Sequence, residues 1–432
     1  MAAVVSLSLL TVLATAALAL FEPLLHPKHL SVRIYWVAPL AGALILLFTG
    51  QISVSRAVDG LLADSAVNPI KILILFFSMT LMSVFLDEAG FFRFLAGKVL
   101  RHAGNSQKKL FLMLYLAVSV LTVFTSNDIV VLTFTPFICY FAKNAKIDPI
   151  PYLIAEFVAA NTWSMALIIG NPTNIYLAAG NGIDFAAYLK VMVLPTVFGG
   201  LVSLGILWLL FVRKLKEPMA GSTEEVHIAD PVTVTLGLAS LGGCIVFLAL
   251  SSYLNFPMWV IAAVACLLLY AAAIPELLWR HRGLSLVTHS IRRAPFDVIP
   301  FVLSMFVLVM ALSDVGATDL LGKLVLGRGE IFACGISSFF AANLLNNIPM
   351  SVLYSTVVTA GGSASLPALY AAVVGSNVGA FFTPMGALAG IMWMTLLKQH
   401  KVKFSFGRFV LYGAAVSIPT LLATLLGLWI ML

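Results

Sequence analysis

Long apolar runs that follow one another almost without interruption are the feature that most constrains the fold of this 432-residue chain. A transmembrane helix needs about 20 apolar residues to cross the hydrocarbon core. Hydrophobic residues make up 61% of the sequence and charged residues only 10%, whereas a soluble domain carries roughly 25% charged residues. We therefore expect an all-α polytopic membrane protein. Its uninterrupted candidate spans are 3–21, 34–50, 70–86, 187–212, 232–251, 257–278, 297–312 and 407–431.

Four further apolar stretches are interrupted near their middle by small, polar or proline residues. They cover 109–142, 151–179, 331–360 and 366–397. Each limb of the first and third stretches holds about 12–16 residues, roughly 18–24 Å of helix, which is shorter than the ~30 Å hydrocarbon core. We expect these two stretches to form re-entrant hairpins and the other two to form broken transmembrane helices.

The broken stretches occur in the same order in both halves of the chain, which indicates an internal repeat. The matched residues are Gly90 with Gly316, Asn127 with Asn346, Asn161 with Asn377, and Pro172 with Pro384. A hairpin that enters and leaves on one face crosses nothing, so each half has five spans and the second half is inverted. The expected fold is two inverted five-span repeats, each with a re-entrant helical hairpin and a broken transmembrane helix, or about 10 spans plus two hairpins. The repeats would cover 1–212 and 232–432, joined by a cytoplasmic linker at 213–231.

The distribution of lysine and arginine supports this topology independently. Cytoplasmic loops of membrane proteins carry an excess of these residues. With the N-terminus outside, most of the 25 basic residues fall on the inner side, and the outer side receives only Arg56, Lys71, Lys190, Lys323 and Arg328. The net charge of +7 therefore indicates retained cytoplasmic loops rather than a nucleic acid partner, and both termini are expected outside.

The helix breaks are the expected functional site. Backbone groups freed inside hydrocarbon are costly unless they serve a ligand or line a cavity, and discontinuous helices commonly form the substrate site of secondary transporters. The side chains at the breaks are amides and hydroxyls without lysine or arginine, which suits a neutral polyhydroxyl solute, an oxyanion or a small cation. The predicted substrate-binding residues are Ser126, Asn127, Asn161, Thr162, Asn171, Thr173, Asn174, Asn343, Asn346, Asn347, Ser376, Asn377 and Thr383.

Two acidic residues are candidates for proton coupling. Asp128 stands in the apolar run TSNDIVVLTFTP, where a carboxylate would take up a proton or hold a cation. The alternative is a protonated aspartate that only caps a helix. Glu156 is the weaker candidate because its place near the inner end of its helix can be interfacial. No P-loop and no metal-ligand spacing occurs in the sequence, so we expect a transporter rather than an enzyme, with no metal or cofactor and with a proton gradient as the energy source.

Four segments of the chain resemble one superfamily of membrane transporters. They are SNDIVVLTFTP at 126–136, FVAANTWSMALIIGNPTNIYLAA at 157–179, NLLNNIPMSVL at 343–353 and ALYAAVVGSNVGAFFTPMGALAGIMWM at 368–394. The chain is similar, over nearly its whole length, to the ion-transporter superfamily that includes arsenite efflux permeases and related sodium/proton antiporters. The resemblance implies proton-coupled export of trivalent arsenic and antimony hydroxides across the bacterial inner membrane, sometimes with a soluble ATPase partner. It also implies that Asn127 and Asp128 form a hairpin-tip pair with Asn346 and Asn347 as their counterpart.

The favoured function is export of arsenite and antimonite, as neutral trihydroxides, in exchange for protons. Alternating access would act on a site between the hairpin tips and the broken helices. Three alternatives stay open. The first is a sodium/proton antiporter with Asp128 as a cation ligand, and the second is a carrier of dicarboxylates or other anions. The third is the membrane channel subunit of an ATP-driven arsenite pump, with a soluble ATPase docking on 213–231 or 279–296.

Overall fold

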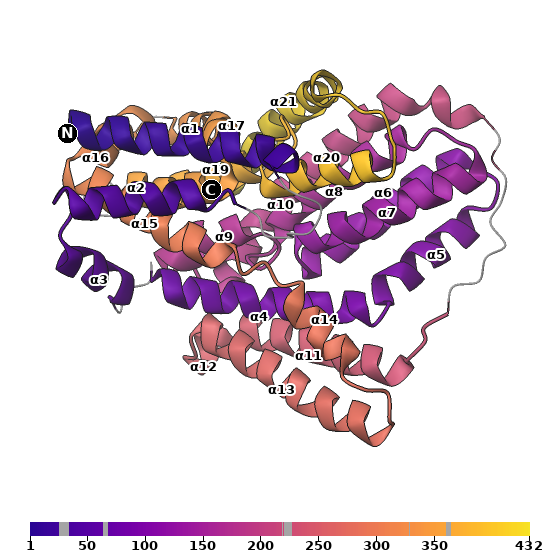
Figure 1. Cartoon of the computed structure of the whole chain (residues 1–432). Helices are drawn as coiled ribbons and strands as arrows, with labels where there is room; N and C mark the ends of the chain where they lie inside the picture. The colour runs from indigo at the N-terminus through magenta and orange to yellow at the C-terminus, as the bar shows by residue number, and fades with distance from the viewer. Residues whose placement is uncertain (26–33, 64–67, 218, 220–226, 328, 360–363) are drawn as a thin grey trace.

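The computed structural model describes residues 1–25, 34–63, 68–217, 219, 227–327, 329–359 and 364–432. Residues 218 and 220–226 of the predicted linker, and Arg328, lie outside the described residues. All regular structure in the described part of the chain is helical (Figure 1). The main helices of the first half are α1 (Ala2–Leu25), α2 (Val37–Phe48), α3 (Val54–Leu62), α4 (Pro69–Glu88), α5 (Phe91–Ala103), α6 (Gln107–Phe124), α7 (Asn127–Ala145), α8 (Ile150–Trp163), α9 (Pro172–Leu177) and α10 (Phe185–Phe211). Those of the second half are α11 (Pro231–Ala249), α12 (Ser251–Leu254), α13 (Met258–Trp279), α14 (Ser285–Arg292), α15 (Val298–Asp314), α16 (Ala317–Val325), α17 (Glu330–Leu345), α18 (Asn347–Val357), α19 (Leu366–Gly379), α20 (Leu388–Gln399) and α21 (Phe406–Met431).

Every apolar run of the sequence is occupied by a helix. Among the described residues, six helices are long and apolar enough to cross a membrane, namely α4, α6, α10, α11, α13 and α21. Helices α15 and α16 form a further apolar pair that bends by 83°. Helix α2 is the one expected span that is markedly shorter than its run, covering Val37–Phe48 of 34–50. The chain is therefore an all-helical, multi-pass membrane protein, as predicted.

The four predicted interruptions are present as breaks between helices. Helix α6 ends at Phe124 and α7 begins at Asn127, while α17 ends at Leu345 and α18 begins at Asn347. The other two interruptions have equal length, 164–171 between α8 and α9 and 380–387 between α19 and α20.

The helix starts correct the register of the repeat. They match Asn127 with Asn347 rather than with Asn346, and Pro172 with Leu388 rather than with Pro384. The sequence pairing was wrong at these positions because identical residues near a break need not occupy equivalent backbone positions. The pairing of Gly90 with Gly316 agrees with the structure. Both precede an amphipathic helix and have a positive φ, 84° and 75°, which a residue with a side chain adopts at a cost.

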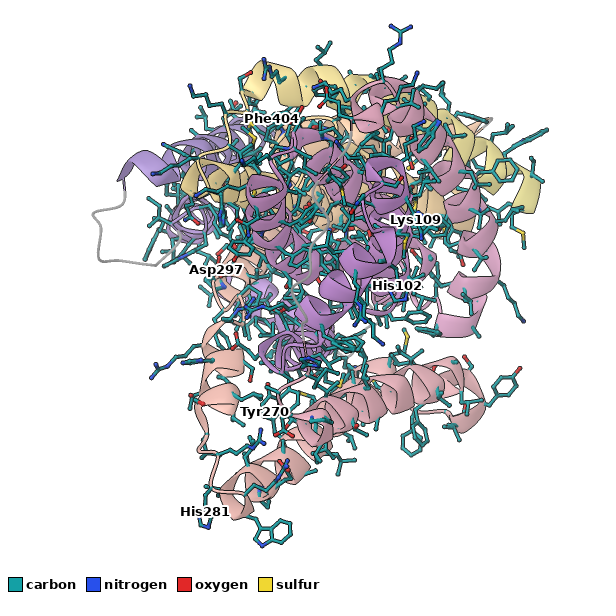
Figure 2. All side chains as sticks on the ribbon, turned by 90° about the vertical axis from the view of Figure 1, so that its right-hand side faces the viewer. His102, Lys109, Tyr270, His281, Asp297 and Phe404 are labelled. Atoms are coloured by element: carbon teal, nitrogen blue, oxygen red, sulfur yellow. The ribbon has the colours of Figure 1, made fainter. Side chains whose placement is uncertain are left out.

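The two halves repeat the same order of packing. Helix α1 packs on α2 and α2 on α15, just as α11 packs on α13 and α13 on α4. Helices α10 and α21 lie against each other between the halves. Helices α5 and α16 lie at opposite ends of the bundle in Figure 1. Figure 2 looks along the bundle from the end that carries α5, and there α11 and α13, with Tyr270, form the lowest layer, which packs on α4.

Ion pairs also cross between the halves in a repeated pattern. Glu88 at the end of α4 accepts from Arg293 (Oε1 to Nη1, 2.6 Å), and Asp314 at the end of α15 accepts from Arg56 (Oδ1 to Nη2, 3.0 Å). Each acidic residue comes directly before the bend into an amphipathic helix. Among the described residues, only the first pair connects to one of the broken stretches, because Arg293 also binds Asp87 at 2.7 Å, and Asp87 accepts from Thr133 of α7 at 2.8 Å.

Helices α17 and α19 approach closely through small residues. A Cβ atom added at Gly375 would lie 2.5 Å from the backbone oxygen of Gly335 and 2.8 Å from the backbone nitrogen of Phe339, and would also meet Ser338. Backbone atoms cannot move aside as a flexible side chain can. The absence of a side chain at Gly375 thus sets how closely α17 packs on α19.

We expect Gly375→Ala to lower the stability of the purified protein by about 1–3 kcal/mol, the usual cost of overpacking. The matched control is Gly205→Ala in α10, where an added Cβ meets nothing within 4 Å and alanine favours the helix. Thermal unfolding in detergent should give a lower midpoint for the first variant only. Equal midpoints for both variants would contradict this account of the α17–α19 contact.

Candidate functional site

The first hairpin tip is held by the first broken helix. Thr125 and Ser126 leave the helical conformation, and the backbone N–H of Asn127 donates to the backbone oxygen of Gly170 (3.2 Å). The side chain of Asn127 donates through Nδ2 to Oδ1 of Asn161 on α8 (3.0 Å). The tip therefore contacts the first limb of the broken helix, at Asn161, and the interruption itself, at Gly170.

The second hairpin tip makes the equivalent backbone contact. Asn347 N donates to the oxygen of Gly386 (3.0 Å), and Nδ2 of Asn346 donates to the oxygen of Met385 (3.2 Å). Asn346 alone separates the two limbs, with φ 74° and ψ 154°. This region of backbone space is occupied almost only by glycine, and another residue there costs about 1–3 kcal/mol. Strain of this kind is typical of functional sites, and the contact to Met385 holds the residue there.

Asn377 joins the two halves at the centre of the molecule. Its Oδ1 accepts from Asn171 Nδ2 (2.9 Å) and from Ser164 Oγ (2.9 Å). Its Nδ2 donates to Asn174 Oδ1 (2.7 Å) and to the oxygen of Val373 (2.8 Å). The whole hydrogen-bonding capacity of this amide is used within the protein, so Asn377 connects α19 to the first broken helix rather than offering free groups to a ligand.

Other predicted site residues satisfy the backbone at the breaks. Asn174 Nδ2 donates to the backbone oxygens of Ser164 (2.8 Å) and Leu167 (3.0 Å). In the second half, Asn343 Nδ2 donates to the oxygen of Gly379 (3.0 Å), and its Oδ1 accepts from both N and Oγ1 of Thr383 (3.1 and 2.7 Å). Thr173 likewise donates to Asn171 Oδ1 (3.1 Å). These amides replace the helical hydrogen bonds that the interruptions remove.

A smaller group of predicted residues keeps open polar atoms. Within the described part of the chain, Asn127 Oδ1, Thr162 Oγ1 and Ser376 Oγ are buried without a hydrogen-bond partner. Asn347 at the second tip is 4% exposed. Buried polar atoms are normally paired, so an open one needs a partner such as water or a ligand. Thr162 faces α10, beside Gly199. The side chains of Asn127 and Asn347, at the two tips, are therefore the best placed to meet a substrate.

The two candidate carboxyls differ in environment. Asp128 lies in the first turn of α7 and is half-buried, where the helix N-terminus favours a negative charge. Glu156 is completely buried within the protein, in the middle of α8. The structure adds two polar partners that the sequence analysis missed, Ser164 beside Asn377 and Thr135 beside Glu156. Both residues lie inside the segments at 126–136 and 157–179 that carry the family resemblance, but only the fold brings each to its partner.

The chemistry of the site follows from its donors and acceptors. The hydrogen bonds that connect the tips and breaks are made by amides, hydroxyls and backbone groups, and none involves a lysine or arginine of the described residues. No group of three or more metal-ligating His, Cys, Asp or Glu side chains is found in the described ranges. Such a site can bind a small uncharged polyhydroxyl molecule by hydrogen bonds alone.

Known proteins similar to this chain are membrane transporters. The profile of the CitMHS family, described as citrate transporter, matches residues 16–365. An arsenical pump membrane protein of Escherichia coli K12 is 28% identical over 370 residues, covering 82% of this chain and 84% of the relative. A putative arsenical pump membrane protein of Bacillus subtilis is 24% identical over 416 residues, covering 89% and 91%. The resemblance inferred from the sequence is thus confirmed, as is the expectation of a transporter rather than an enzyme.

A solved structure shares the fold. The YdaH transporter of Alcanivorax borkumensis aligns with a TM-score of 0.55 and 16% sequence identity, covering 99% of this chain and 97% of that one. The likeness extends over nearly the full length of both chains, so the helices of this chain are arranged in a known fold.

The strained tip gives one test. Asn346→Gly and Asn346→Ala both lose the side-chain contact to Met385, but only the glycine variant relieves the backbone strain. We expect the glycine variant to be more stable than the alanine variant by about 1–3 kcal/mol, measured by thermal unfolding of the purified proteins. An alanine variant as stable as the glycine variant would show that Asn346 carries no strain.

The Asn377 connection gives a second test. Asn377→Ala would leave Nδ2 of Asn171 and Oδ1 of Asn174 buried without the partner that Asn377 provides, and each such group costs roughly 1–3 kcal/mol. The control is Asn181→Ala, which removes a single half-buried bond to the oxygen of Leu177. Thermal unfolding should show a clearly larger loss for the first variant. A similar loss in both would mean that Asn377 does not join the halves energetically.

Proposed function

The chain belongs to the citrate transporter family of membrane proteins, and on that premise we propose that it is a secondary active transporter that exports arsenite and antimonite in exchange for protons. The observation that carries the proposal is the chemistry of the tips and breaks, where amides and hydroxyls meet without a basic side chain. At neutral pH arsenite is largely an uncharged trihydroxide, which needs hydrogen-bond donors and acceptors and no counter-charge. Relatives named arsenical pump membrane proteins, which align over 82% of this chain, support the same substrate.

The site would lie between the two hairpin tips. Asn127 and Asn347 would contact the substrate with their side chains, and the remaining predicted amides would hold the breaks in shape. Two inverted five-span repeats, each with a re-entrant hairpin, would expose the site alternately to either side of the membrane. Equal interruptions at 164–171 and 380–387, and matching backbone bonds at both tips, support this topology. In this account the protein lies in a bacterial inner membrane with both termini in the periplasm.

Protons would supply the energy through Asp128. This carboxyl follows directly on the tip residue Asn127, so its charge would change next to the substrate. Alternating protonation would exclude simultaneous binding of proton and substrate, which is the requirement for exchange. No cofactor or metal is needed for this mechanism, and no ATPase subunit is needed either if the purified protein transports in liposomes with only a proton gradient.

An anion carrier is the second candidate function. The family description as citrate transporter favours it, and the first turns of α7 and α18 start at the tips, where helix N-termini attract anions. A panel of arsenite, antimonite, sodium and citrate, scored by thermal stabilisation of the purified protein, separates the candidates. We expect stabilisation by antimonite and arsenite, and stabilisation by citrate alone would favour the anion carrier.

Transport in everted membrane vesicles tests the proposed function directly. Vesicles with an acidic interior should accumulate arsenite, and Asp128→Asn should reduce this to the level of vesicles without the protein. Asp148→Asn is the matched control, because Asp148 pairs with Lys214 at the surface (2.9 Å) away from the breaks, and it should transport as the wild type does. Accumulation that persists in Asp128→Asn would remove Asp128 from the coupling role.

A further inference from the structure

A second carboxyl is enclosed in the bundle away from the hairpin tips. Glu156, on α8, is 0% exposed. Its oxygens Oε1 and Oε2 share one donor, the hydroxyl of Thr135 on α7, at 3.2 Å each. Glu156 makes no ion pair with any described residue, so no positive charge compensates a negative charge on its carboxyl. An ionised carboxylate in such a place is costly.

Three helices meet at Glu156, and they come from both halves of the chain. Thr135 belongs to the first hairpin, Glu156 to the first broken helix, and Trp393 to α20 of the second broken helix, which packs on α7. The indole N–H of Trp393 is buried and has no hydrogen-bond partner within the described residues, and it faces the same carboxyl. The titratable group that faces Glu156 from α7 is the thiol of Cys139.

The two protonation states of Glu156 place different demands on these helices. The neutral acid is compatible with the present arrangement, in which one hydroxyl donor is shared and the indole N–H is left open. The carboxylate needs more donors, and the nearest open one is the N–H of Trp393. Loss of the proton would therefore draw α20 towards α7 and α8, and uptake of the proton would release it.

We propose that Glu156 is a second proton-binding site, at which protonation sets the contact between the first hairpin and the second broken helix. This inference rests on the proton coupling proposed above and extends it from the tip to the junction of the halves. Asp128 senses the substrate, whereas Glu156 lies where the two moving parts would touch.

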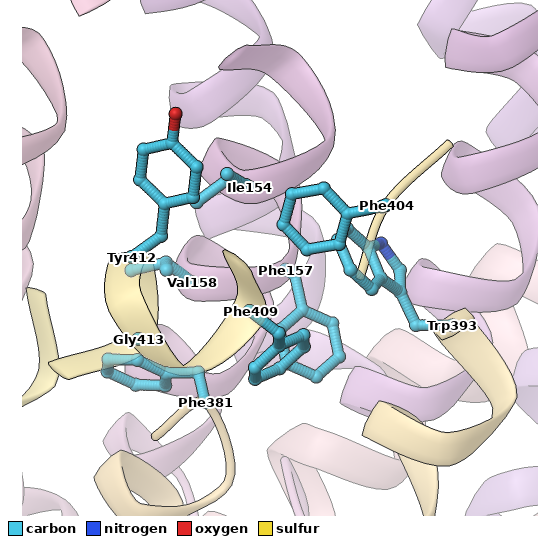
Figure 3. A pocket seen from close by; sticks show the side chains of 9 residues that line it. All are labelled: Ile154, Phe157, Val158, Phe381, Trp393, Phe404, Phe409, Tyr412 and Gly413. Carbon is cyan, nitrogen blue, oxygen red and sulfur yellow. The ribbon is translucent and has the colours of Figure 1, made fainter. Parts of the chain in front are cut away.

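An aromatic pocket lies next to this junction (Figure 3). Trp393, Phe404 and Phe409 form its wall together with Phe157, the residue after Glu156. The rings of Trp393 and Phe404 meet edge to face with centroids 5.4 Å apart. The enclosed volume of about 10 Å³ is at the lower limit for a single water molecule.

Infrared difference spectroscopy of the purified full-length protein tests the proton site without reference to substrate. In an Asp128→Asn background, which removes the other candidate carboxyl, a titration from acid to alkaline pH should show the carbonyl band of a buried protonated carboxyl, and adding Glu156→Gln should remove that band. The control Glu217→Gln removes an exposed glutamate and should keep it. A band that persists in Glu156→Gln, or one that never titrates, would overturn the proposal even if arsenite transport by the wild type is confirmed.

Transport in proteoliposomes tests the coupling role. Glu156→Gln should retain arsenite–arsenite exchange when the pH is equal on both sides. Its accumulation of arsenite in a pH gradient should fall by at least about tenfold, because one pH unit corresponds to a tenfold driving force. Trp393→Phe and Thr135→Val each remove a donor to the carboxylate. Each should shift the pH dependence of arsenite accumulation to higher pH, by about one pH unit. Thr135→Ser should restore it. A purely structural role predicts equal loss of exchange and accumulation with an unshifted profile.

Discussion

The fold depends on one constraint, which is that every backbone polar group inside the bilayer must find a partner within the protein. Four helix breaks release such groups, and asparagine side chains satisfy them. Asn174 donates to the backbone oxygens of Ser164 and Leu167. Asn343 donates to the oxygen of Gly379 and accepts from the backbone N–H of Thr383. Because these amides are committed to the backbone, the breaks are rigid, and the few atoms left open stand out as groups available to a ligand.

The sequence predicted the positions of the breaks because interruption of an apolar run by Asn, Thr, Gly and Pro has a direct physical meaning. It could not predict which amides keep atoms without a hydrogen bond. Asn171, for example, donates to Asn377, which is 206 residues away in the chain. The sequence also misplaced the register of the repeat at Asn346 and Pro384, because backbone hydrogen bonds define equivalence there and residue identity does not. Helix α20, which brings Trp393 to Glu156, lies more than 200 positions away in the sequence. The sequence around Glu156 therefore could not predict this neighbour.

The two halves are similar in layout but unequal in chemistry. The first tip carries Asp128 after its asparagine, whereas Ile348 follows the asparagine of the second tip. The first hairpin is also tied to the ion pair of Arg293 through Thr133 and Asp87, and the second hairpin has no equivalent connection among the described residues. A repeated scaffold with titratable groups on one hairpin would allow one half to respond to protons while both halves contact the substrate.

The central claim is that substrate binds between the two hairpin tips, at the side chains of Asn127 and Asn347. A cryo-electron microscopy structure of the purified protein with antimonite tests this most directly, because antimony scatters strongly enough to be located. The account predicts a density peak within hydrogen-bonding distance of both asparagine side chains, and its absence in the Asn127→Leu variant. A peak bound instead at one of the buried cysteines, such as Cys139 or Cys334, would contradict it.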